Sequence, residues 1–401
     1  NGLCVRAKNN ERRKTMKKFF ITLMCIVMVV CFMPTVAFAD STTTCSSECD
    51  HAASITVNAA TTHYDTLQEA VNAATDGSET TIKLLKNVEE NIQINSGKII
   101  VLDLDGHVLT DNGDNTIKSM GTLYLKSSTN GGSVVNHTAK RCALYTSGGA
   151  LNVENVSISN VSDCNKELIY ISSNTDAEII SGIFTQNASK NLLYASAKKD
   201  VVIKGGTFIQ NGDYEMIYSY DSGTRIVIEG GTFTNNGTKQ MLYLSHSGKY
   251  SISDGTFNGG SAEILPNSSD CGVTGGKFSN PVNPINCVVG YAPTKVAADG
   301  YYCVIGLTDG TAAVVLTYIN EESATVTAYY ADPAVALADS FQKTGATVTI
   351  TKDVTVTSDL NAYKSKLVVN EGATLTCKSI KVSINGTSGV TVKNNGTINA
   401  S

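Results

Sequence analysis

Five tyrosines recur through the middle of the chain at nearly constant spacing, and each could contact a ligand through both its ring and its hydroxyl group. Each tyrosine follows a Leu or an Ile, and the steps between them are 25, 24, 24 and 25 residues. They are Tyr145, Tyr170, Tyr194, Tyr218 and Tyr243. Because tyrosine combines a large apolar ring with a polar tip, a row of them could bind a glycan or a protein edge. The chain contains no Trp, the other aromatic residue with a polar group.

Strand alternation predicts that these tyrosines point outward. The residue before each is always Leu or Ile, so that face is expected to form the core. The same alternation would expose the residues two positions earlier, Ala143, Leu168, Leu192, Met216 and Met241, and two positions later, Ser147, Ser172, Ser196, Tyr220 and Ser245. Such an apolar strip with a hydroxyl border is typical of a binding surface. Two alternatives stay open: the rings stack inside, or a loop or a later module covers them.

Cysteines are the second group of residues with possible chemistry. Cys142 and Cys164 lie almost one repeat apart, and Cys287 and Cys303 flank an expected hairpin, so all four are candidate disulfide partners. Cys45 and Cys49 precede His51, but no second ligand pair follows at zinc spacing. The sequence therefore predicts no metal site and no cofactor.

Acid–base catalysis on a glycan requires two carboxylates held close together at one site. Glu154 and Glu178 lie one repeat apart, but acidic residues do not accumulate over three consecutive repeats, as a Ca²⁺ site would favour. His107 follows Asp105 in a turn pattern and is expected to be a solvated surface residue. The net charge is −5 and no basic stripe occurs, so a nucleic-acid partner is not expected. No catalytic residues are assigned.

A second repeated phrase, out of phase with the tyrosines, indicates the elements that position them. It ends in Gly-Gly-Thr-Phe at 205–208 and 230–233, and its aromatic members are Phe184, Phe208, Phe233, Phe257 and Phe278. A period of 24 or 25 residues is too short for two helices and suits one coil of short strands, which rises about 4.8 Å per turn. We expect inward ladders of Phe and of the Ile or Val five residues earlier. Asn187, Asn211 and Asn236 are expected to stack in a turn.

These phrases resemble those of the single-stranded right-handed parallel β-helices of the pectin-lyase-like superfamily, and more closely of the repeat-rich β-helix proteins secreted to Gram-positive bacterial surfaces. The resemblance covers about Ala53 to Val304. The resemblance implies a parallel β-helix fold. It does not imply one function, because this scaffold hosts enzymes, adhesins and capsid spikes. Enzymes of the family cleave acidic polysaccharides. Asn174-Thr175-Asp176 matches one hydrolase fragment, but no adjacent Asp-Asp, Gly-His-Gly or Arg-x-Lys motif accompanies it.

The first part of the chain has the features of an export signal. Residues 1–15 are interpreted as upstream read-through, and residues 16–39 as a signal peptide with a basic start, an apolar core and cleavage after Ala39. We expect a flexible segment over 40–52, no membrane span after signal removal, and a secreted or cell-surface bacterial protein. In the mature chain, only Arg141 and Arg225 remain as arginines.

The expected architecture is all-β. Residues 53–280 form the parallel β-helix, with a short cap helix that begins in a capping box at Thr66 and Glu69. Residues 281–331 are expected to be a linker of β-hairpins. Residues 332–401 are expected to begin a second, truncated β-helix module, with a cap helix from Asp332 to near Gly345.

Together these patterns favour a non-catalytic binding or structural role, as an adhesin, a glycan-binding module or a stalk. The expected partner is a glycan or a host or cell-surface protein. The alternative is a polysaccharide lyase or glycoside hydrolase that acts on acidic glycans. The absence of family motifs from the sequence, and its shortage of arginine, favour the first class.

Overall fold

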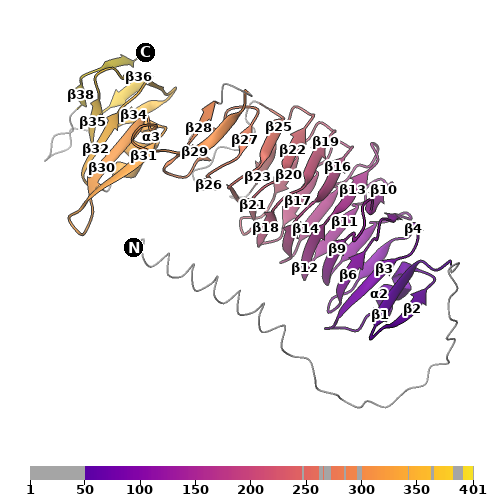
Figure 1. The fold of residues 1–401 in the computed structure, drawn as a ribbon. Coiled ribbons are helices and arrows are strands. Elements are labelled where there is room, and N and C mark those ends of the chain that lie inside the picture. The colour runs from indigo at the N-terminus through magenta and orange to yellow at the C-terminus, as the bar shows by residue number, and fades with distance from the viewer. Residues whose placement is uncertain are drawn as a thin grey trace. The chain divides into compact units, whose positions relative to one another are not determined.

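Short parallel strands, one repeat apart, pair along most of the chain, as the 24- and 25-residue period predicts. The computed structural model describes residues 50–245, 248–261, 265, 272–283, 286–295, 300–341, 343–362, 365–382 and 392–400. These residues are nearly all β and form a β-solenoid with about 12 turns in total, divided into a first and a second solenoid (Figure 1). The predicted all-β, parallel β-helix fold class is therefore confirmed.

Three sheets run through the first solenoid. In spatial order, sheet A contains β2 (Ala60–Tyr64), β1 (Ala53–Val57), β3 (Glu79–Leu84), β6 (Ile99–Asp103), β9 (Thr122–Lys126), β12 (Ala150–Glu154), β15 (Asp176–Ile179), β18 (Asp200–Ile203), β21 (Arg225–Ile228), β24 (Lys249–Ile252) and β26 (Gly272–Val273). Sheet B contains β28 (Tyr291–Lys295), β29 (Tyr302–Gly306), β27 (Lys277–Phe278), β25 (Thr256–Gly259), β22 (Thr232–Asn235), β19 (Thr207–Gln210), β16 (Gly182–Gln186), β13 (Val156–Asn160), β10 (Ser133–Asn136), β7 (Val108–Thr110) and β4 (Val88–Glu89). Sheet C contains β23 (Leu242–Leu244), β20 (Ile217–Ser219), β17 (Leu193–Ser196), β14 (Ile169–Ser172), β11 (Leu144–Ser147), β8 (Ile117–Ser119) and β5 (Ile92–Ile94).

The predicted phenylalanine ladder lies in the core. The five rings are Phe184, Phe208, Phe233, Phe257 and Phe278, and all are fully buried. Their centroids are 4.7–4.8 Å apart and their planes differ by 5–15°. The same register continues back through Ile158, Val134 and Leu109. The Ile or Val five residues before each Phe forms the second buried ladder, on sheet A.

The glycine two residues before each core phenylalanine lies at a backbone bend that is unfavourable for other residues. Gly182 and Gly206 have φ values of 136° and 108°, in the region that L side chains rarely adopt. A Cβ atom on Gly182 would lie 2.4 Å from the carbonyl oxygen of Val156 in the preceding coil. The Gly-rich phrase therefore brings consecutive coils into close backbone contact.

The N-terminal end of the core is covered by a helix and a hairpin. Helix α2 (Leu67–Ala73) begins at the predicted capping box, since Thr66 and Glu69 exchange side-chain and backbone hydrogen bonds. Its residues Leu67, Ala70 and Val71 join the buried core. Strand β2, which the sequence did not predict, pairs antiparallel with β1. Its five residues, Ala-Thr-Thr-His-Tyr, lack the apolar alternation that marks a half-buried strand.

The C-terminal region forms a second parallel solenoid with its own core. Sheet D contains β31 (Thr325–Tyr330), β30 (Val314–Ile319), β32 (Thr344–Ile350), β35 (Lys366–Val369) and β38 (Val392–Asn394). Sheet E contains β33 (Val354–Thr355), β36 (Thr374–Cys377) and β39 (Thr397–Ala400), and sheet F contains β34 (Asp359–Asn361) and β37 (Ser379–Lys381). Helix α3 (Pro333–Ser340) starts after the predicted N-cap Asp332.

Two boundaries differ from the sequence prediction. The expected hairpin linker is divided between the two solenoids: β28 and β29 extend sheet B, whereas β30 and β31 belong to sheet D. Helix α3 ends before Gly345, which lies inside β32 with a φ of 65°.

The predicted read-through, signal peptide and Cys45–Cys49 segment lie outside the described residues. Within the described residues, no helix is long and apolar enough to span a membrane.

Candidate functional site

Sheet C places all five candidate tyrosines in one row. The backbone register aligns Tyr145 with Tyr170, Tyr170 with Tyr194, and so on to Tyr243, along β11, β14, β17, β20 and β23. The residues on either side of each tyrosine within these strands face inward, as shown by buried Leu144, Thr146 and Ile171. The tyrosines therefore point outward, and we call this row the tyrosine ladder.

Three of the four neighbouring ring pairs in the tyrosine ladder are stacked, and the Tyr145–Tyr170 pair is tilted by 30°. Centroid distances are 5.3 Å for Tyr145–Tyr170, 4.6 Å for Tyr170–Tyr194, 5.1 Å for Tyr194–Tyr218 and 5.2 Å for Tyr218–Tyr243. Tyr243 is 40% exposed and the other four are half-buried. Tyr220, which is 44% exposed, lies beside the row at 6.1 Å from Tyr194 and 6.4 Å from Tyr218.

The expected aliphatic border does not exist. The residues two positions before the tyrosines, Ala143, Leu168, Leu192, Met216 and Met241, are all buried. Strand alternation fails at these positions because the strands of sheet C begin only one residue before each tyrosine, so the preceding residue lies in a corner that turns inward. On the other side, Ser147, Ser196, Tyr220 and Ser245 reach the surface in part, while Ser172 is buried.

A buried polar ladder that the sequence analysis missed fixes this corner. Its members are Asn136, Asn160, Gln186, Gln210 and Asn235. Gln186 Nε2 donates to the carbonyl oxygens of Lys166 and Asn191 at 3.1 and 2.9 Å, and Gln210 Nε2 donates to that of Lys190 at 2.9 Å. Since unpaired buried carbonyls are costly, these amides hold the loop that leads into each strand of sheet C. The sequence pattern that could have predicted this ladder is an Asn or Gln just before the turn in successive repeats.

The outer side of the same turn carries the predicted asparagine stack. Asn211 Nδ2 donates to Asn187 Oδ1 at 2.7 Å, and Asn236 Nδ2 donates to Asn211 Oδ1 at 2.8 Å. Asn187 in turn donates to the carbonyl oxygen of Asn160. The amide stack and the tyrosine ladder thus repeat with the same coil spacing.

Cationic side chains stand four residues before four of the five tyrosines. They are Arg141, Lys166, Lys190 and Lys239, with Tyr214 at the remaining position. The Lys166 ammonium lies 5.3 Å from the centroid of the Tyr170 ring and 2.9 Å from Glu167, and the Lys190 ammonium lies 5.4 Å from that of Tyr214. These cationic positions recur with the same period as the tyrosines, and they were not among the site residues predicted from the sequence.

Burial affects the ionisation of two tyrosines in the middle of the ladder. Desolvation raises the pKa of Tyr170 and of Tyr194, and the neighbouring tyrosines raise that of Tyr194 further. Tyr170 and Tyr194 therefore keep their phenol protons at physiological pH, and these two hydroxyl groups can both donate and accept hydrogen bonds. Because the faces of Tyr194 and Tyr218 are covered by neighbouring rings, a ligand there would meet ring edges and hydroxyl groups.

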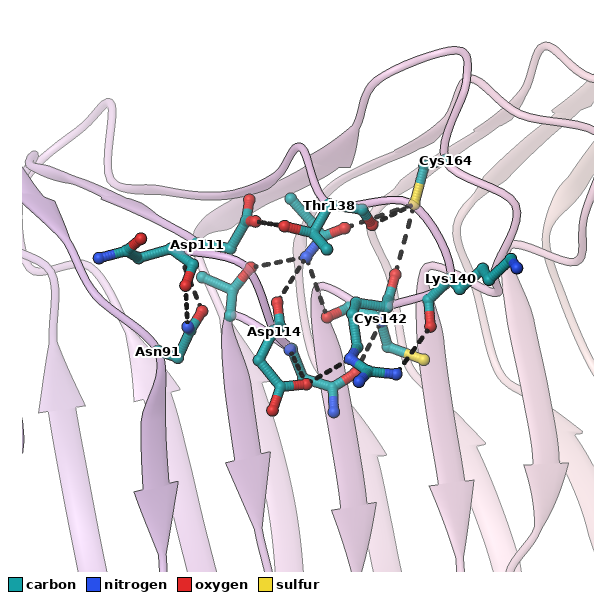
Figure 2. A network of polar contacts seen from close by, with 12 residues as sticks. Asn91, Asp111, Asp114, Thr138, Lys140, Cys142 and Cys164 are labelled. Carbon is teal, nitrogen blue, oxygen red and sulfur yellow. Dashed lines mark hydrogen bonds and ion pairs between the residues drawn. The ribbon is translucent and has the colours of Figure 1, made fainter.

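The four candidate disulfide cysteines are free thiols in the structure. The Cys164 sulfur lies 3.3 Å from the carbonyl oxygen of Arg141 and 3.4 Å from that of Thr138, within a polar network that also holds Asp111 and Asp114 (Figure 2). Figure 2 shows the Cys142 side chain directed away from that sulfur. Neither predicted pair, Cys142–Cys164 or Cys287–Cys303, is therefore bonded in the structure. For the first pair the reason is that the two side chains point in different directions (Figure 2).

We predict that Cys142 resists alkylation in the folded protein. Burial raises the pKa of this thiol to about 12, and Glu167 adds to the rise. At about pH 8, iodoacetamide should modify Cys142 at least about a hundredfold more slowly in native buffer than in denaturant, where a thiol has a pKa of about 8.5. Because the folded pKa is raised, stability from the neutral thiol should be lost as pH rises from about 8.5 toward 12. Equal labelling rates in the two buffers would contradict the buried position.

Three carboxylates on the outer face of sheet A are paired with cations. Asp176 Oδ2 lies 2.6 Å from Lys199 Nζ, Asp200 Oδ2 lies 2.5 Å from Arg225, and Glu178 pairs with Lys204. Each pair joins consecutive coils, so Asp176 of the Asn-Thr-Asp fragment has a structural partner. No group of three His, Cys, Asp or Glu side chains that could hold a metal ion occurs among the described residues.

No family model, curated protein or solved structure matches this chain. The fold and the tyrosine ladder are therefore the basis for any functional proposal.

Proposed function

We propose that this chain is an exported bacterial cell-surface protein whose solenoid binds or presents, without cleaving, a glycan or a surface protein. It would act as an adhesin, a glycan-binding module or a stalk of the Gram-positive, pectin-lyase-like type. The single observation that carries the proposal is the tyrosine ladder, five outward rings in register on one parallel sheet. A periodic row of this kind suits a periodic or extended partner.

The chemistry of the row indicates how such a partner would be held. Phenol hydroxyl groups repeat at the strand spacing and could hydrogen-bond successive polar groups of a ligand. The partly exposed Ser147 and Ser196 add further hydroxyl groups beside them. Tyrosine is enriched in protein interfaces because it offers large contact area together with a polar tip.

A binding screen on purified protein tests this proposal. The probes are an array of cell-wall and host glycans and a set of extracellular matrix proteins, run beside an assay for unsaturated products on polygalacturonate. Saturable binding to a probe without product formation is expected. Turnover of polygalacturonate would contradict the non-catalytic role and favour the alternative, a polysaccharide lyase or hydrolase.

The proposed export of the protein predicts where its mature N-terminus lies. The leader is expected to be removed after Ala39, so the exported protein should begin at Asp40. Mass spectrometry of the protein recovered from the medium or the cell wall of an expressing bacterium measures that terminus. A terminus before Met16, or protein retained with its leader in the cytoplasm, would contradict the proposed localisation.

A further inference from the structure

We infer that the tyrosine ladder is also a site of oxidative modification, at which a one-electron oxidant of the haem-peroxidase class joins neighbouring coils through bonds between adjacent tyrosine rings. The reaction would convert a non-covalent row into covalent cross-links between repeats. It is independent of the proposed function, since it requires the rings themselves and no ligand.

The geometry brings each reactive ring against another of the same kind. Four successive centroid distances lie between 4.6 and 5.3 Å, and the Tyr194 and Tyr218 planes differ by only 7°. Backbone pairing holds the partners in register, so no search through solution is required. Tyr220 gives an additional, more exposed partner for Tyr194 and Tyr218. Coupling would therefore join rings that are already neighbours in the folded chain.

Access from solvent is sufficient for an oxidant to start the reaction. Tyr243 at one end of the row is 40% exposed, and the other ladder tyrosines are half-buried with their outer edges on the surface. Because consecutive rings are stacked, an electron removed from one ring can be replaced from the next. Oxidation at the exposed end can therefore be followed by coupling at any adjacent pair.

The balanced reaction joins two phenols and consumes one hydrogen peroxide. Each of two tyrosines loses one electron to the oxidised peroxidase and one proton to water, giving two phenoxyl radicals. Their ortho carbons form one C–C bond, and the two ortho hydrogens then move as protons to the phenolic oxygens, which restores both rings. The two electrons and two protons lost reduce hydrogen peroxide to two water molecules, so the protein loses two hydrogen atoms per link.

The sequence allows each link to be assigned to a particular pair of coils. Trypsin cleaves at Arg141, Lys166, Lys190, Lys204, Arg225 and Lys239, so the five ladder tyrosines fall on five different peptides. The purified chain would be treated with horseradish peroxidase and limiting hydrogen peroxide, digested, and analysed by tandem mass spectrometry. We expect linked peptides that join neighbouring rungs, such as Tyr170 with Tyr194, with a yield per chain independent of protein concentration.

A variant removes the reaction while it keeps the stacked rings. In the Tyr170→Phe, Tyr218→Phe, Tyr220→Phe chain, no two remaining ladder tyrosines are adjacent, so the ladder links should be lost. A control with the same number of tyrosines removed elsewhere, Tyr124→Phe, Tyr302→Phe, Tyr329→Phe, should retain them. Circular dichroism checks that both variants keep the wild-type fold. Equal link yields in the two variants, or links formed only between separate molecules, would overturn the inference.

Discussion

Replacing Phe208 by Ala is expected to lower the free energy of unfolding by about 3–5 kcal/mol. The Phe208 ring is fully buried and stacked between Phe184 and Phe233 at 4.7 Å on either side. Removing it leaves a cavity in a core one ring wide, and the neighbouring coils cannot close it without breaking their hydrogen-bonded register. Urea unfolding followed by circular dichroism measures the change.

Two controls separate cavity formation from other effects. Phe208→Leu keeps most of the apolar volume and should cost less than Phe208→Ala. Phe341→Ala makes the same chemical change at a residue that is 45% exposed, and should alter stability by about 0.5 kcal/mol or less. A loss below about 1 kcal/mol for Phe208→Ala would show that the ring is not packed as described.

Gly182→Ala is expected to destabilise the protein by about 3 kcal/mol, although it adds only one methyl group. The φ of 136° is strained for any L side chain, and the added Cβ would lie 2.4 Å from the Val156 carbonyl oxygen and 3.0 Å from the Phe184 ring. The obstructing oxygen belongs to the backbone of the adjacent coil, so relief of the clash must separate two coils.

Gly310→Ala is the matched control for this prediction. An added Cβ there would meet nothing within 4 Å, and no left-handed φ constrains the residue. Its stability should equal that of the wild type or exceed it slightly, because Ala reduces the freedom of the unfolded chain. If the two substitutions had equal effects in urea unfolding, the close coil contact at Gly182 would be refuted.

The repeated features of the fold were predictable from the sequence because a solenoid places equivalent residues in register. The inward Phe208 and Phe233 follow from their Gly-Gly-Thr-Phe phrases, and the tyrosine row follows from the constant Leu or Ile before Tyr194 and its equivalents. The capping box at Thr66 also fixed the start of α2, because its hydrogen bonds are local.

Features that depend on three-dimensional placement were not predictable in the same way. Leu168 and its equivalents are buried because the chain turns a corner there, and a period-two pattern cannot locate a corner. The ring planes of the tyrosine ladder cover one another, which depends on side-chain rotation. Cys142 and Cys164 are correctly spaced for contact between coils, yet spacing does not define the direction of either sulfur.

Binding by a variant that lacks two central rings of the tyrosine ladder is the most direct test of the proposed binding surface. The Tyr194→Ala, Tyr218→Ala chain would be compared with the wild type, and with Tyr124→Ala as an exposed tyrosine on sheet A, against the glycan or protein probe that the wild type binds. If each ring contributes about 1 kcal/mol, the double variant should bind roughly thirtyfold more weakly, while Tyr124→Ala binds as the wild type does. Unchanged affinity in a correctly folded double variant would contradict the proposal that the tyrosine ladder is where a partner docks.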